Sequence, residues 1–135
     1  AEIGDAMIDR VAEQLQRITW SREDVRSFLG SYLTEPKPHV FFDAPDEPLD
    51  FDEFVTACSE DGFSLDARTL FLFSDGQFFM NGETVEIDEQ DRDALRRLAD
   101  ARRIASLEGI SEGMQEELYE WYCCGFAFPS GALMD

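Results

Sequence analysis

Residues 73–87 read FSDGQFFMNGETVEI, a stretch in which two turn signals enclose an aromatic run. The signals are the dipeptides Asp75-Gly76 and Asn81-Gly82, and both favour the positive φ angles of type I′ hairpin turns. The region as a whole contains four short β-prone runs, at 63–65, 69–73, 77–80 and 83–87. We therefore predict a tightly turned β-ribbon whose aromatic face packs to seal a small domain.

Three amphipathic helices are predicted upstream of the ribbon. The first spans residues 5–18, where apolar residues recur at helical spacing. The second begins after Ser21, which forms a capping box with Asp24, and it ends before Pro36. The third begins after Asp50 and ends at Asp61-Gly62.

Two more helices are predicted downstream of the ribbon. One begins at Asp88 and runs to about Arg103, and the other begins at Ser111 and ends at Gly125. The last ten residues, FAFPSGALMD, are expected to form a short tail. From residue 50 onward the order is thus helix, ribbon, helix, helix, which predicts a small α+β, winged-helix-like domain.

A proline-rich connector divides the chain into two parts. Residues 36–48, PKPHVFFDAPDEP, carry four of the five prolines and are expected to be extended. We therefore predict a helical segment over 1–44 and the winged-helix-like domain over 45–135. The helical pair within 5–35 is too short to bury both of its faces alone, so it must pack on the second domain or on another copy of the chain.

The charge balance constrains the partners. The 135 residues include 30 Asp and Glu against 11 Lys and Arg, a formal net charge of −19. Such a surface repels phosphate backbones and anionic membranes over a Debye length of about 8 to 10 Å. A basic partner is expected, and neither a nucleic acid nor a membrane is. Three cysteines without metal-ligand spacing suit a reducing cytoplasm.

Most catalytic and metal-binding motifs are missing from the sequence. His39 is the only histidine, so an iron site with two imidazoles and one carboxylate cannot form within this chain. No phosphate-binding glycine motif occurs, and the acidic run at 43–53 lacks the offsets of a calcium loop. We therefore predict no catalytic residue and no metal ligand in this chain.

Two weaker patterns point towards nucleic acids. Five arginines fall on the helix predicted from Asp88, but acidic residues alternate with them, so ion pairs across the helix are the better interpretation: Arg92, Arg96, Arg97, Arg102 and Arg103. Four ribbon phenylalanines could stack on bases, but we expect them to form core instead: Phe71, Phe73, Phe78 and Phe79.

The order of these parts resembles a known family. A helical pair, a proline-rich linker, a ribbon ending in FFMNGE and a last helix ending in ELYEWYCCGFAFP together resemble the C-terminal region of the bacterial ribosomal oxygenases. These are cupin-type JmjC proteins that hydroxylate an arginine of a large-subunit ribosomal protein. The most distinctive short match is Asn81-Gly82-Glu83, and DEPLDFDEFVTA resembles the entry into the family's winged-helix domain.

The resemblance implies that this chain is the non-catalytic half of an oxygenase. The Fe(II) and 2-oxoglutarate of such a parent lie in an N-terminal barrel with an HxD pair and a distal histidine, none of which is present here. This chain would serve dimerisation and substrate presentation, with a basic ribosomal protein as the parent's substrate. The expected homodimer interface comprises Met7, Ile8, Val11, Leu15, Ile18, Phe28, Leu29 and Tyr32.

Another class of function fits the charge equally well. A free-standing acidic module, such as a DNA mimic or an inhibitor, would also bind a basic protein. The chain begins with Ala1 rather than Met, which suggests a processed chain or a piece of a longer protein. The sequence upstream of Ala1 would discriminate between the two hypotheses.

Overall fold

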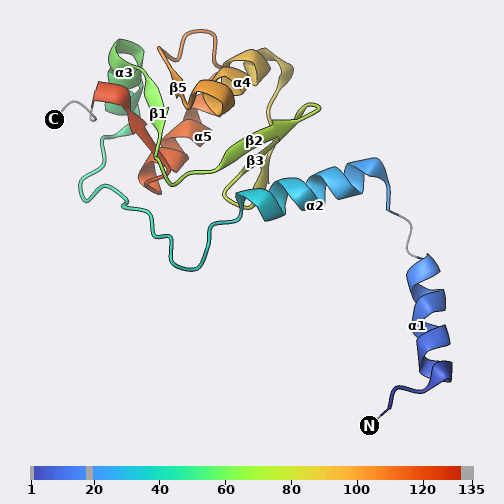
Figure 1. The fold of residues 1–135 in the computed structure, drawn as a ribbon. Helices are drawn as coiled ribbons and strands as arrows, with labels where there is room; N and C mark the ends of the chain where they lie inside the picture. The colour runs from blue at the N-terminus through green and yellow to red at the C-terminus, as the bar shows by residue number, and fades with distance from the viewer. Residues whose placement is uncertain (1, 18–19, 132–135) are drawn as a thin grey trace.

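The computed structural model describes residues 2–17 and 20–131. In these residues helices and short strands alternate along the chain, in the order α1 (Asp5–Arg17), α2 (Arg22–Thr34), α3 (Phe51–Asp61), β1 (Phe63–Leu65), β2 (Phe71–Ser74), β3 (Gln77–Met80), β4 (Glu83–Val85), η1 (Glu89–Asp91), α4 (Arg92–Ala101), β5 (Arg103–Ile104), α5 (Glu112–Cys123) and β6 (Ala127–Pro129). The α+β class expected from the sequence is confirmed, and Figure 1 shows the arrangement.

The helix starts follow the capping residues. Ser21 accepts a hydrogen bond from the backbone N–H of Asp24, whose carboxylate accepts one from the N–H of Ser21. Asp50 and Glu53 form the same reciprocal pair at the start of α3. Each box satisfies backbone donors that the first turn of a helix leaves free. Both helices therefore begin where the sequence predicts.

The ribbon is the antiparallel sheet β2-β3-β4. Phe73 lies opposite Phe78 and Leu72 opposite Phe79, so the side chains of each pair share a face of the sheet. The turns have φ angles of 46° at Asp75, 83° at Gly76, 46° at Asn81 and 94° at Gly82. Positive φ at both central residues is the backbone that a type I′ turn requires.

A second sheet differs from the sequence prediction. Strand β1 does not join the ribbon; it lies between β5 and β6 in the order β5-β1-β6. The helix predicted to reach Arg103 ends at Ala101 instead, because Arg102 adopts a left-handed backbone with φ 65°. Part of the supposed tail forms β6. Strands β5 and β6 carry too little alternation to be recognised in the sequence.

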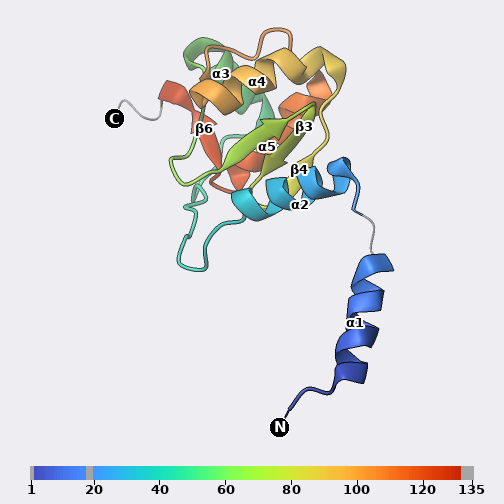
Figure 2. The same ribbon diagram turned by 45° about the vertical axis from the view of Figure 1, so that its right-hand side comes forward.

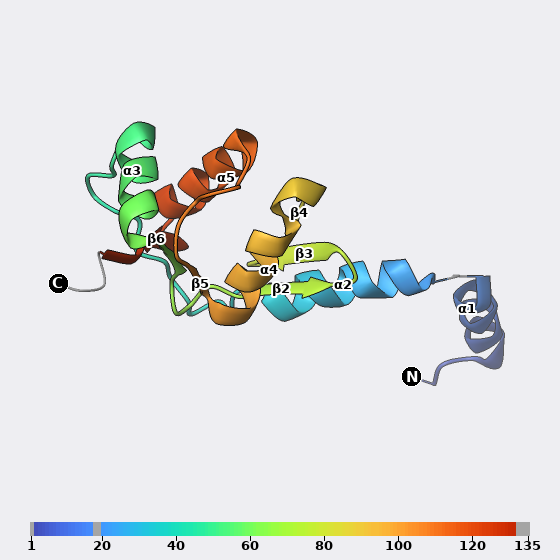
Figure 3. The same ribbon diagram turned by 90° about the horizontal axis from the view of Figure 1, so that it is seen from above.

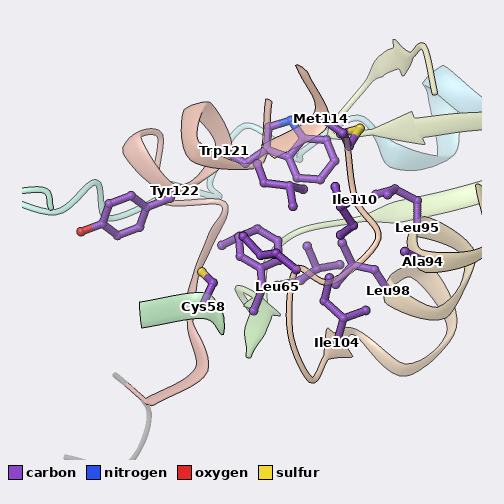
Figure 4. Packing of buried hydrophobic residues seen from close by; sticks show 14 of the residues in the cluster. Cys58, Leu65, Ala94, Leu95, Leu98, Ile104, Ile110, Met114, Trp121 and Tyr122 are labelled. Atoms are coloured by element: carbon purple, nitrogen blue, oxygen red, sulfur yellow. The ribbon is translucent and has the colours of Figure 1, made fainter. Parts of the chain in front are cut away.

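The hydrophobic core lies between these two sheets and helices α3, α4 and α5. Figure 4 shows Trp121 and Met114 of α5 above Leu65, Leu95 and Leu98, which come from β1 and α4. The ribbon contributes its inner face to this cluster, namely Phe71, Phe78 and Met80. Its outer face remains available for α2.

Candidate functional site

Helix α2 packs on the outer face of the ribbon with its small side. Gly30 and Thr34 are buried there, whereas Phe28 and Tyr32 on the opposite side are 61% and 63% exposed. Figure 2 shows α2 lying across the sheet, on the side away from α5. A helix normally turns its large apolar residues to the core. The reversed orientation of α2 therefore leaves its main hydrophobic face without cover in this structure.

Close contact with Phe79 explains the small residue at Gly30. A Cβ atom at Gly30 would lie 2.4 Å from the ring carbons of Phe79, a distance that side chains do not tolerate. The Phe79 ring is almost fully buried, so it cannot move aside easily. The ring thus packs directly against the helix backbone.

Both turns of the ribbon hold α2 in place. The Gly82 N–H donates to the Thr34 hydroxyl at 2.9 Å, and this hydroxyl donates to the Gly30 carbonyl at 2.8 Å. At the other turn, Arg26 donates to the Ser74 hydroxyl at 3.1 Å and lies 3.4 Å from the Asp75 carboxylate. The two turns thus fix α2 near its two ends and determine which face it presents outward.

The outward face of α2 and the adjoining strand form one apolar surface. A groove of about 450 Å³ runs between the helix and β2, lined by Val25, Leu29 and Leu33 on the helix side and by Leu72 and Phe79 on the strand side. Phe28 and Tyr32 continue the surface, their rings stacked with centroids 5.9 Å apart. We call these seven residues the α2 apolar surface.

Helix α1 presents a second apolar face. Every residue of α1 is exposed, including Met7, Ile8, Val11 and Leu15, which share one side of the helix. Figures 1 and 3 show α1 standing apart from the rest of the chain. A single helix of this length is marginal in water without packing of its apolar face.

The structure therefore brings the predicted interface residues to the surface. Phe28, Leu29 and Tyr32 lie on the α2 apolar surface, and four of the others lie on α1, while Ile18 falls outside the described residues. Val25, Leu33 and Leu72 also belong to this surface, although they were not predicted from the sequence. Gly30 and Thr34, four residues apart on one side of α2, were the available signal, since they mark the side that packs closely.

The connector is attached to the domain rather than free. Arg68 donates to the Phe41 carbonyl at 2.7 Å, pairs with Asp66 at 2.8 Å and lies over the ring of Phe42. Its hydrogen bonds to Asp66 lower the pKa of that carboxyl from its ordinary value. The hydroxyl groups of Tyr119 and Tyr122 bond the carbonyl and the N–H of Leu49, respectively. These contacts fix the path between α2 and α3.

Residues suited to catalysis are not gathered in the described parts of the chain. Among residues 2–17 and 20–131, no three His, Cys, Asp or Glu side chains are placed to hold a metal ion, and His39 is exposed on the connector. Burial raises the pKa of the Cys58 thiol to about 12, so it is not a nucleophile at neutral pH. The single histidine and these positions do not fit an iron site.

The two patterns that pointed towards nucleic acids have different outcomes in the structure. Phe71, Phe78 and Phe79 are buried and Phe73 packs against the core, so they form no stacking platform. The arginines predicted on one helix are divided, because Arg102 caps α4 and Arg103 lies in β5. The ion pairs predicted for them are not found, since the salt bridges among the described residues involve only Arg17, Arg26 and Arg68. Within the described residues, no helix is long and apolar enough to cross a membrane.

A family model and several solved structures match this chain. A family model described as "ROXA-like winged helix" matches residues 13–127. The chain is similar in structure to YcfD from Escherichia coli, with a TM-score of 0.70 at 16% identity over 95% of this chain and 35% of that chain.

A second structure of Escherichia coli YcfD, described as a ribosomal oxygenase in complex with cobalt and 2-oxoglutarate, matches with a TM-score of 0.68 at 18% identity, over 95% of this chain and 36% of that one. The chain thus spans about a third of the length of the solved structures it matches. No curated protein matches it in sequence.

Proposed function

The chain belongs to the ROXA-like winged-helix family, and from this premise we propose that it is the non-catalytic C-terminal region of a ribosomal protein hydroxylase that depends on Fe(II) and 2-oxoglutarate. In this role it joins two copies of the protein and helps to present a basic ribosomal protein to the catalytic domain. The partial coverage of the ribosomal oxygenase YcfD supports the assignment, since nearly the whole chain corresponds to about a third of that protein.

The observation that carries the proposal is the reversed orientation of α2. Its small side packs on the ribbon, and its large apolar side faces outward together with the apolar face of α1. Fully burying one large apolar side chain contributes about 1.5–3 kcal/mol. Because association costs about 4–15 kcal/mol in lost freedom, covering several of these half-exposed side chains on each copy suffices to hold a dimer.

A second copy is the partner that this surface fits best. Both faces lie on one chain, so a two-fold arrangement can bury the α1 and α2 surfaces of both copies at once. We assign no residue of this chain a part in the oxidation reaction, because its single histidine and its described carboxylates form no iron site. The acidic surface would attract a basic substrate protein and repel the RNA that competes for it.

Charged substitutions in α1 test the dimer. We expect Val11→Glu combined with Leu15→Glu to convert the dimer into a monomer, because each substitution places a carboxylate in the apolar interface. The measurement is the mass of the intact chain by light scattering after gel filtration.

A matched control adds the same charge to the opposite side of α1. Ala6→Glu combined with Gln16→Glu should leave the dimer mass unchanged, since both residues lie away from the apolar face. An unchanged dimer in the Val11 and Leu15 variant would refute the interface, and equal dissociation of both variants would attribute the effect to charge alone.

A further inference from the structure

Helix α1 and the groove between α2 and β2 match each other in spacing and in charge. The groove has a volume of about 450 Å³, and no residue of α1 is buried. We propose that α1 of one copy lies in this groove of a second copy, parallel to α2, so that the two copies exchange their first helices. The inference rests on the proposed dimer and adds which surfaces meet in it and in which direction.

Each of the two helices carries a row of apolar residues at intervals of four. The row on α1 consists of Met7, Val11 and Leu15, and the row on α2, which lines the groove, consists of Val25, Leu29 and Leu33. Rows at this interval are the ridges by which helices pack against each other. Each row is about 12 Å long. One row can therefore lie along the other over its whole length.

One end of the groove is basic. Arg22 and Arg26 line it beside the first turn of α2, and no carboxylate is among the described residues of the lining. Arg96 adds a third guanidinium, whose carbon lies 4.9 Å from the ring centroid of Phe73 in the same lining. Among the described residues, only Arg26 of the three forms a salt bridge, with Asp75 at 3.4 Å. This end can therefore attract further carboxylates.

The other end of α2 is acidic. Glu35 and Glu83 are exposed there and line the cleft beside Phe28 and Tyr32, and the described residues of this cleft include no basic side chain. Lys37 of the connector lines neither the cleft nor the groove. The surface that α2 presents thus changes from basic to acidic along the helix.

Helix α1 and the residues before it carry charges in the complementary order. Residues 2–9 contain three carboxylates and no basic side chain: Glu2, Asp5 and Asp9. Residues 10–17 contain two arginines and one carboxylate: Arg10, Arg17 and Glu13. Arg17 pairs with Glu13 at 2.8 Å, but both side chains are largely exposed, so the pair contributes little. The start of α1 is therefore acidic, and its end carries a net positive charge.

Only a parallel arrangement brings opposite charges together. With the two apolar rows side by side in parallel, Asp5 would lie beside Arg22 at the basic end, and Arg17 would lie beside Glu35 at the acidic end. An antiparallel arrangement would reverse both pairings and place like charges together. Because like charges across an interface oppose association, the charge order selects the parallel direction.

The α1 helix of the same chain cannot occupy the groove in this direction. Five Cα–Cα steps connect Arg17 to Arg22, and they span at most about 18 Å. In a parallel arrangement Arg17 would lie level with Glu35, about 20 Å along the axis of α2 from Arg22 and about 9 Å to the side. The helix could reach its own groove only by folding back antiparallel, with the charges mismatched. The occupant is therefore α1 of a second copy.

Charge reversal tests the direction in the intact chain. Arg22→Glu and Asp5→Lys should each raise the dissociation constant of the dimer about threefold or more at low salt, because each places like charges side by side in both halves of the dimer. The double variant keeps the net charge of the starting chain and should recover its dissociation constant, measured by sedimentation equilibrium. Tighter association of the single variants, or no recovery in the double variant, would overturn the parallel arrangement.

Isotope-filtered NOE measurements between a labelled and an unlabelled copy identify the helices that meet. We expect contacts between copies from the methyl groups of Val11 to those of Leu29, and from Met7 to Val25. Contacts confined to one copy would show that α1 folds back, and they would overturn the exchange. A dimer without contacts between α1 and the groove would also overturn the exchange but leave the proposed dimer intact, whereas a chain that stays monomeric would refute both.

Discussion

Gly30 is the residue at which helix and ribbon come closest. The Phe79 ring occupies the space that any side chain at this position would need. The fit explains why a residue of low helix propensity stands in the interior of α2. The position of α2 on the sheet therefore depends on this contact, because a larger residue at position 30 would displace the helix from the ribbon.

Gly30→Ala tests this contact. Although alanine favours helices, we expect it to lower the free energy of unfolding by about 1–3 kcal/mol, because the methyl group overpacks against a buried ring. Gly113→Ala in α5 is the matched control, since nothing lies within 4 Å of its Cβ position, and it should be neutral or stabilise by up to about 1 kcal/mol. Urea denaturation measures both, and a stabilised Gly30→Ala variant would contradict the contact.

Among the elements, the ribbon has two functions because its faces differ. One face contributes Phe71, Phe78 and Met80 to the core, and the other carries α2. Tight turns at both ends keep the strands short and bring Thr34 and Arg26 within hydrogen-bonding distance of the turn residues. The closely spaced turns of FSDGQFFMNGETVEI therefore serve to seat a helix as well as to seal a domain.

Thr34→Val tests the attachment of α2 to the second turn. Valine keeps the shape of threonine but leaves the Gly82 N–H without its acceptor, so we expect a loss of about 1–3 kcal/mol in the free energy of unfolding. Thr56→Val on the exposed side of α3 provides the matched control and should change stability little. Equal effects of the two substitutions in urea denaturation would show that the turn does not hold the helix through this bond.

The sequence predicted the elements that carry strong local signals. The capping boxes at Ser21 and Asp50 fixed two helix starts, and the hairpin turns followed from their Asp-Gly and Asn-Gly dipeptides. Strands β5 and β6 could not be predicted, because they are stabilised by pairing with β1, distant in sequence.

For the interface, the sequence identified apolar residues but could not tell which side of α2 faces the ribbon. Val25, Phe28, Leu29, Tyr32 and Leu33 follow a helical period, which normally predicts a buried face. In the structure this face points outward, because Gly30 and Thr34 occupy the side that packs on the sheet. Helical periodicity identifies an apolar face of a helix. Which part of the molecule covers that face depends on tertiary contacts, which the periodicity does not contain.

At the scale of the whole molecule, the chain combines apolar helices with an acidic surface. Two copies that each carry a formal charge of −19 repel one another, so the proposed dimer has to rest on apolar burial. The α1 face and the α2 apolar surface provide that area, and the ribbon fixes the orientation of α2. We propose that a second copy covers these two helices.

Hydrogen–deuterium exchange of the α1 and α2 amides, followed by mass spectrometry at high and at low chain concentration, tests this claim most directly. We expect both helices to exchange slowly at high concentration, where two copies associate, and α1 to exchange rapidly once dilution separates them. Rapid exchange of α1 at both concentrations would contradict it, because the apolar face of α1 would then remain uncovered in solution.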